Sequence, residues 1–326
     1  MATPTITVAP LPPSIEPAVT EDSRRARKAR RKAAERSVRT LASPMALRTR
    51  KGKTIYWTVF TVVLVAFVIG FLFPLYWMVT GAMKSTQELV TTPPTIVPQV
   101  WHPSNFASAW DQMNLAQYLG NTALQAGGAW LLQLVFLTMA AYALSKLKPV
   151  FGQIILGAIV ATLMVPASAL LVPKYLTVVS LPFTGTNLLN SPLAIWLPAV
   201  ANAFNLYLLK RFFDQIPSEM MEAAALDGAG ALRTLWSIVL PMARPVLGVV
   251  SIFAIVAVWQ DFLWPLLVFT DTTKQPISVA VVQLQANLPM NLTLAALVLA
   301  SIPMVVIFLI FQRHIVAGIS AGSLKG

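Results

Sequence analysis

The sequence predicts an all-α integral membrane protein with six transmembrane helices and both termini in the cytoplasm. Three observations lead to this prediction. Hydrophobic residues make up 56% of the 326 residues and charged residues only 11%, whereas soluble domains carry about 25% charged residues. Long apolar segments account for this excess. The basic residues, finally, collect on one side of those segments.

Residues 1–53 are predicted to form a disordered, basic cytoplasmic extension. Thirteen of the 24 Lys and Arg residues lie between Arg24 and Lys53, and residues 1–20 are rich in Pro and Thr. The run RRARKARRKAAER also fits nucleic-acid binding. Its position just before the first apolar segment favours a tail that orients this segment instead, so no nucleic-acid partner is expected. The segment itself is too long for a signal peptide and lacks a small-residue cleavage site, so the membrane attachment should persist.

Residues 54–326 are predicted to form one membrane domain of six spans. A helix needs about 20 apolar residues to cross the hydrocarbon layer. The segments that qualify are Tyr56–Thr80, Tyr118–Leu144, Gln153–Val172, Leu189–Leu209, Val246–Thr270 and Leu292–Phe311. Prolines that can kink them are Pro74, Pro166, Pro198 and Pro265. Small residues that can let spans pack closely are Ala123, Gly127 and Ala158.

The basic residues orient the spans. With the N-terminus inside, only Lys84, Lys174 and Lys274 fall on the outer side, which leaves 21 of the 24 Lys and Arg residues in the cytoplasm. Cytoplasmic segments of membrane proteins carry this excess of Lys and Arg. Both termini are therefore predicted to be cytoplasmic, and residues 211–245 to form a cytoplasmic loop between the fourth and fifth spans.

This loop is predicted to contain two short helices. Ser218 is expected to cap the first helix, and Gly228 to end it. In the second helix, spacing places four apolar residues on one stripe, and Pro241 is expected to end the element. The stripe consists of Leu232, Leu235, Trp236 and Val239. The first helix is small-faced and acidic, which suits the groove of another protein.

Catalysis by this chain is not predicted. Glu222 and Asp227 are five residues apart, so on a helix they point to different faces. The chain has no cysteine, which excludes a thiolate nucleophile and a thiolate metal site. The run GKT at 52–54 lacks the glycine that a phosphate-binding loop requires at position 47, where Leu47 stands. We therefore expect no metal or cofactor on this chain.

The loop resembles the EAA signature of the membrane subunits of ABC importers, in which E-A-A is followed by three residues, G, nine residues and I-x-L-P. Here the matching residues are Glu222-Ala223-Ala224, Gly228 and Ile238-x-Leu240-Pro241. Other segments are similar to the carbohydrate branch of that family, the maltose-type permeases. They are PLYWMVTGAMKSTQEL, AAYALSKLKPVFG, VPASALLVPKYL, WQDFLWPLL and FQRHIVAGISAGSLKG. The resemblance covers residues 56 to 326.

The resemblance implies a permease of the bacterial cytoplasmic membrane that pairs with a second, related permease. A dimer of separate ATPase subunits would bind ATP and Mg, and a solute-binding protein would deliver sugar from outside. In the family the first loop helix docks in a cleft of the ATPase. Carried over, the ATPase-coupling residues are Glu222, Ala223, Ala224, Leu226, Asp227 and Gly228. Gly228→Asp, or a bulky residue at Ala223, is expected to abolish uptake.

A polar group in the fifth span predicts the solute pathway. A charge inside a span costs about 2.5–3.5 kcal/mol on insertion scales, so Asp261 should face a cavity or a partner. Together with Trp259, Gln260 and Trp264 it predicts a polar, aromatic-rimmed path for sugar. A helix–helix hydrogen bond near the outer interface, where Trp also collects, is the alternative.

Two other functions stay open. Within the family, the solute can be glycerol phosphate or another polar molecule. Outside it, a self-contained secondary transporter or channel would move its solute alone, driven by an ion gradient. That function leaves the loop without a purpose, and the scarcity of charges within the spans argues against it.

Overall fold

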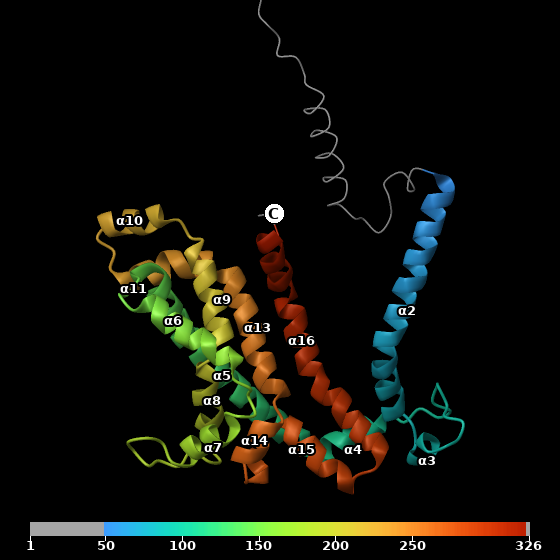
Figure 1. The fold of residues 1–326 in the computed structure, drawn as a ribbon. Coiled ribbons are helices and arrows are strands. Elements are labelled where there is room, and N and C mark those ends of the chain that lie inside the picture. The colour runs from blue at the N-terminus through green and yellow to red at the C-terminus, as the bar shows by residue number, and fades with distance from the viewer. Residues whose placement is uncertain (1–48, 324–326) are drawn as a thin grey trace, which may run out of the picture. The chain divides into compact units, whose positions relative to one another are not determined.

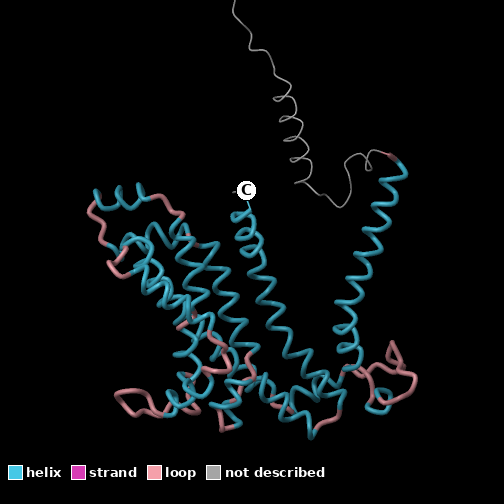
Figure 2. The backbone as a smooth tube through the Cα atoms, in the orientation of Figure 1, coloured by secondary structure: helices cyan, strands magenta, loops and turns pink. Residues whose placement is uncertain are grey.

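The computed structural model describes residues 49–323, with side chains described as far as Gln312. Over this range the chain is helical and contains no strand (Figure 2). The predicted all-α class is therefore confirmed. Most of the predicted basic extension, residues 1–48, lies outside the described residues, as do residues 324–326.

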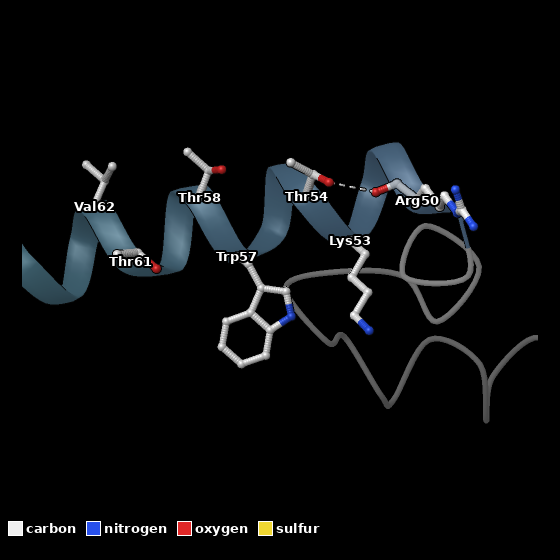
Figure 3. A pocket seen from close by; sticks show the side chains of 7 residues that line it. All are labelled: Arg50, Lys53, Thr54, Trp57, Thr58, Thr61 and Val62. Atoms are coloured by element: carbon white, nitrogen blue, oxygen red, sulfur yellow. Dashed lines mark hydrogen bonds between the residues drawn. The ribbon is translucent and has the colours of Figure 1, made fainter.

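Helix α2 (Arg50–Ala82) is the first long apolar helix. It begins at Arg50, so it takes in the end of the predicted extension. The chain divides into two units between Phe73 and Pro74, within this helix. In the first unit, basic and aromatic side chains follow the start of α2 (Figure 3), where the Thr54 hydroxyl donates a hydrogen bond to the Arg50 carbonyl at 3.0 Å. Basic and aromatic residues are typical of a helix end at a membrane interface.

The segment after α2 buries its charged residues. It includes the short helix α3 (Thr86–Leu89) and leads to α4 (Ser104–Gln112). Lys84 is 1% exposed; its ammonium donates to the Thr95 carbonyl and lies 4.7 Å from the centroid of the Trp77 ring. Glu88 accepts hydrogen bonds from the Thr95 hydroxyl at 2.7 Å and the Gln99 backbone N–H at 2.9 Å. These contacts give each buried charge a partner, as burial of a charge requires.

Helix α5 (Leu115–Tyr142) is central to the second unit. A π-helical turn, Ala143–Leu147, continues it. It packs against α8, α9 and α13, while α13 also packs against α16. Small residues permit this close approach: Ala126 and Ala129 of α5 are 2% and 0% exposed.

The segment predicted as the third span is interrupted. Its helix consists of α6 (Gly152–Ala161) and a 3-10 turn, Thr162–Met164. Val165 then adopts an extended conformation with ψ 124°, because the following Pro166 disfavours the helical region for the residue before it. The chain becomes helical again in α7 (Leu171–Val179). The predicted third span is therefore helical only to Met164, and its last two residues are the first two of α7.

The segments predicted as the fourth and fifth spans are also broken. Helices α8 (Leu193–Val200) and α9 (Ala203–Asp214) meet at 45°. Pro198 lies inside α8, and the break falls after it, at Ala201 and Asn202. Helix α13 (Arg244–Gln260) ends at Asp261, which is extended, and α14 (Leu263–Val268) follows.

The loop between α9 and α13 lies at one end of these helices, and α7 and α14 lie at the other (Figure 1). The loop contains α10 (Ser218–Leu226), α11 (Ala231–Thr234), a π-helical turn, Leu235–Val239, and α12 (Leu240–Met242). After α14 come a 3-10 turn, Thr272–Lys274, helix α15 (Ile277–Leu284), another such turn, Gln285–Asn287, and the long helix α16 (Met290–Ser323).

Three helices of the described chain are long and apolar enough to cross a membrane by themselves, and five spans result if each bent pair counts as one. The three are α2, α5 with its π-helical extension, and α16. The bent pairs are α8 with α9, and α11 to α12 with α13. Length and composition therefore support three to five of the six predicted spans.

Candidate functional site

The predicted ATPase-coupling residues lie on an exposed helix. Glu222, Ala223 and Leu226 of α10 are exposed, Leu226 to 89%, whereas Ala224 is 4% exposed and faces the protein. The predicted cap at Ser218 is wrong. Pro217 occupies the cap position, Ser218 is the first helical residue, and no side chain caps the helix. Pro217 can take this role because its fixed φ of −57° starts the chain toward the helix.

Gly228 ends α10, as predicted, through a turn that requires glycine. Its φ is +73°, a left-handed conformation that costs other residues roughly 1–2 kcal/mol. The Ala229 N–H donates to the Ala224 carbonyl at 2.9 Å, and the Gly228 N–H to the Ala225 carbonyl at 3.0 Å. This pair of bonds is the Schellman motif, which satisfies the free carbonyls at a helix end. The turn presents Asp227 and Gly228 at the surface.

The second helix of the loop connects α10 to the bundle. Leu235 and Val239 are 3% and 0% exposed and pack in a cluster with residues of α5, α9 and α13. Leu232 and Trp236, by contrast, are 66% and 69% exposed. Two of the four residues predicted for the apolar stripe are therefore buried against the bundle, and the other two stay exposed in this chain.

The predicted helix end at Pro241 is confirmed to within one residue, because the element ends at Met242. The helical path continues through α12, and α13 starts at Arg244 after a sharp bend of 84°. Pro241 lies in the first turn of α12, where a proline removes no hydrogen bond that the helix needs. Ala243 is fully buried at the bend and belongs to the same cluster as Leu235 and Val239.

A second candidate site is a cavity of about 160 Å³ at the other end of α13, which we call the polar chamber. Five helices contribute to its wall, and two helix breaks meet there, the α8/α9 break and the α13/α14 break. The polar lining consists of Gln133, Lys174, Asn202 and Asp261. The apolar lining consists of Ile195, Pro198, Ala199, Ala201, Ala257, Val258 and Trp264. Helices broken near a cavity are a recurrent way to expose backbone polar groups to a solute.

The structure separates the four predicted pathway residues. Asp261 and Trp264 line the polar chamber, whereas Trp259 is 9% exposed within an apolar cluster and Gln260 is exposed elsewhere. The Asp261 Oδ1 accepts a hydrogen bond from the Trp264 backbone N–H at 3.2 Å. Its backbone carbonyl accepts one from the Ser278 hydroxyl at 2.8 Å. Asp261 thus holds the first turn of α14, which begins at Leu263, and also lines the chamber.

Trp264 lines the chamber with little freedom to move. It is 4% exposed, and its indole N–H donates to the Ala194 carbonyl at 3.0 Å. The ammonium of Lys174, in α7, lies 3.8 Å from the centroid of the indole ring, within the range of a cation–π interaction. Trp264 therefore fixes one wall and positions the lysine.

Three polar residues of the chamber are absent from the sequence-based site. Gln133 donates from Nε2 to the Ala199 carbonyl at 2.5 Å and accepts from Asn205 Nδ2 at 2.7 Å. The Asn202 side chain accepts from the Asn205 backbone N–H at 2.9 Å and so caps α9. Gln133 is the single polar residue of an apolar run, WLLQLVFL, and Asn202 lies between two apolar runs. An isolated polar residue within a predicted span is the sequence signal that could have identified both. Lys174 follows the end of the predicted third span and was therefore placed on the outer side, whereas in the structure it belongs to α7.

Neither site resembles a metal centre. Among residues 49–323, no group of three or more His, Cys, Asp or Glu lies close enough to hold a metal ion. What the structure offers is a protruding helix at one end of α13 and a polar chamber at the other. Such an arrangement can transmit motion along α13 from the helix to the chamber.

Comparison with known proteins identifies the family. The family described as the inner membrane component of binding-protein-dependent transport systems matches residues 105–321, which include both sites. The chain belongs to this family. It is therefore a permease subunit of an ABC importer, as the resemblance implied.

The permease is similar to the diacetylchitobiose uptake system permease protein NgcG of Streptomyces coelicolor, with 29% identity over 77% of this chain and 83% of that protein. It is equally similar to the melibiose/raffinose/stachyose import permease protein MelC of Bacillus subtilis, with 29% identity over 78% of this chain and 91% of that protein. A crystal structure of a bacterial ABC transporter involved in the import of the acidic polysaccharide alginate shares the fold, with a TM-score of 0.73, 22% identity, and coverage of 81% of this chain and 98% of that chain.

Proposed function

We propose that the permease imports a sugar or oligosaccharide across the bacterial cytoplasmic membrane. The observation that carries this proposal is the likeness to two oligosaccharide permeases over more than three quarters of the chain. The polar chamber supports it, because its donors and acceptor suit hydroxyl groups, which both donate and accept hydrogen bonds. Asp261 and Trp264 are the predicted pathway residues that can contribute there, because they line the chamber and Trp259 and Gln260 do not.

We further propose six spans with both termini in the cytoplasm. The loop containing α10 would then face the cytoplasm, and α7 and α14 the outside. Their positions at opposite ends of the α9 and α13 helices agree with this orientation (Figure 1). A test follows from the absence of cysteine in the native chain. A cysteine at position 183, where Phe183 is fully exposed, should react with an impermeant thiol reagent in intact cells. A cysteine at position 222 should react only after permeabilisation; the reverse pattern would overturn the orientation.

Transport would be driven by separate ATPase subunits that hold ATP and Mg. The exposed residues of α10 and its Schellman turn would dock in an ATPase cleft. Motion of α10 would pass through the buried Leu235 and Val239 to α13, and so to the α13/α14 break at Asp261. A second, related permease would complete the pore, and an extracytoplasmic solute-binding protein would deliver the solute.

The decisive experiment is uptake by vesicles that contain both permeases and the ATPase, supplied with the binding protein. Neutral oligosaccharides should stimulate ATP hydrolysis and accumulate inside. Ala223→Trp should abolish both effects while the binding protein keeps its affinity for sugar, and Ala223→Ser should preserve them. Stimulation by glycerol phosphate alone would identify the other solute class. Accumulation by this chain without ATP, driven by an ion gradient, would contradict the mechanism.

A further inference from the structure

Lys174 occupies a special position in the wall of the polar chamber. It lines both this chamber and an adjoining cavity of about 320 Å³, which we call the apolar groove. The groove is otherwise lined by Thr177, Val178, Leu181, Leu188, Leu197 and Pro198. Only Lys174 and Pro198 belong to both linings. The groove reaches the loop after α7 at Leu181 and Leu188, so Lys174 stands between this loop and the chamber.

The ammonium of Lys174 has free hydrogen-bond donors. Among the described residues it makes no hydrogen bond and no ion pair within 4.0 Å, and its recorded partner is the face of the Trp264 ring. A ring face uses the charge of an ammonium but leaves N–H groups for a ligand. Gln133, an amide in the same lining, is by contrast already hydrogen-bonded: it donates to the Ala199 carbonyl and accepts from Asn205.

The charges of the chamber balance only when the lysine is present. Asp261 contributes one negative charge, while at each of the two breaks the carboxyl-terminal end of one helix meets the amino-terminal end of the next, so their opposite partial charges offset each other. Lys174 is the one positive side chain in the lining. Because both charged groups are partly buried, an uncompensated charge there acts more strongly on a bound solute than it would in bulk water.

We propose that Lys174 is a specificity-determining residue of the permease: it binds oxygen atoms of the solute between the apolar groove and the polar chamber, and it neutralises Asp261 so that the chamber accepts uncharged sugars. This assignment rests on the proposed function. It predicts that removal of the ammonium weakens transport of neutral sugar and shifts the preference toward a cationic one.

The test compares two solutes in vesicles that contain the complete transporter, with the same binding protein in every reaction. The probes are a neutral disaccharide that the wild-type transporter accumulates and its amino-sugar counterpart. Lys174→Gln should reduce uptake of the neutral sugar about tenfold, the effect of losing one hydrogen bond to a charged group, and raise the ratio of amino sugar to neutral sugar. Lys174→Arg, which keeps the charge, should leave this ratio near the wild-type value.

Two further variants separate a charge effect from a structural one. Lys274→Gln removes an exposed lysine whose ammonium lies 3.8 Å from Asp271, away from the chamber, and should match the wild type. Lys174→Gln combined with Asp261→Asn removes both charges and should return the ratio toward the wild-type value. An unchanged ratio in Lys174→Gln, or a double variant that keeps the altered ratio, would overturn the role of Lys174. Absence of sugar uptake by the wild-type transporter would instead overturn the proposed function, and this assignment with it.

Discussion

Two adjacent glycines of α5 differ sharply in their surroundings. A Cβ added at Gly128 would lie 2.0 Å from the Trp196 ring of α8, far inside van der Waals contact. The ring has little room to yield, because its N–H donates to the Gln125 carbonyl at 3.1 Å. At Gly127, by contrast, an added Cβ meets no atom within 4 Å. Gly127 was the glycine predicted to pack spans together, and this prediction is wrong; Gly128 has that role.

Gly128→Ala is therefore expected to destabilise the permease and Gly127→Ala to stabilise it. Overpacking costs about 1–3 kcal/mol, and displacement of Trp196 would also remove a hydrogen bond of about 0.5–1.5 kcal/mol. Both variants gain the same helix propensity, up to about 1 kcal/mol, so the pair isolates the contact. The measurement is the midpoint of thermal unfolding of the purified transporter in detergent. The reasoning fails if the two variants shift the midpoint equally.

The same change should also reduce transport. Helix α8 supplies Ile195, Pro198 and Ala199 to the polar chamber, so displacement of Trp196 moves part of the chamber wall. Gly128→Ala should lower the rate of sugar uptake even at a temperature where the transporter stays folded. Gly127→Ala, with the same composition, should keep the wild-type rate.

Further predictions concern four other positions. Gly228→Ala should weaken the coupling of ATP hydrolysis to uptake in vesicles, because alanine must adopt a φ of +73° at a cost of roughly 1–2 kcal/mol. Gly230→Ala is the control: its φ of −70° suits any residue, so uptake should match the wild type. Asp261→Leu should impair uptake more than assembly, measured by co-purification; normal uptake would remove this residue from the pathway. Gln133→Leu should lower the unfolding midpoint by the equivalent of about 1–3 kcal/mol, because it leaves buried Asn205 Nδ2 without its acceptor, and a wild-type midpoint would argue against this network. Glu88→Gln should make the unfolding midpoint less dependent on pH in the acidic range, measured by comparing thermal unfolding of this variant with the wild type at several acidic pH values.

The direction of the Glu88 effect follows from its surroundings. Burial acts to raise the pKa of this carboxyl, but hydrogen bonds from Thr95 and Gln99 and the nearby charges of Lys84 and His102 hold the pKa below its ordinary value of 4.5. A group with a lowered pKa in the folded state stabilises the protein above its unfolded pKa. The stabilisation is lost as the pH falls below 4.5 and through the folded value. A pH dependence that persists unchanged in Glu88→Gln would assign it to another group.

The sequence alone was sufficient wherever the determining forces are local. Long apolar runs predict helices whether or not their neighbours are known, and α2, α5 and α16 follow from them. The end of α10 at Gly228 is also a local property, because only the backbone of that residue must adopt a left-handed conformation. The coupling helix, a contiguous motif, could be located for the same reason, although its docking stays a prediction.

Tertiary structure decided the features that depend on residues far apart in the chain. Gln133, Lys174, Asn202 and Asp261 come from segments separated by up to 128 positions, and no periodicity indicates that they share one cavity. Their meeting depends on where Val165, Ala201 and Asp261 break their helices and on how α5 packs against α8 and α13. A break changes a span's direction, so it determines which polar side chains converge. Hydropathy shows only that a segment avoids water. The same apolar segment has the same hydropathy whether it forms one unbroken helix or two helices that enclose a chamber.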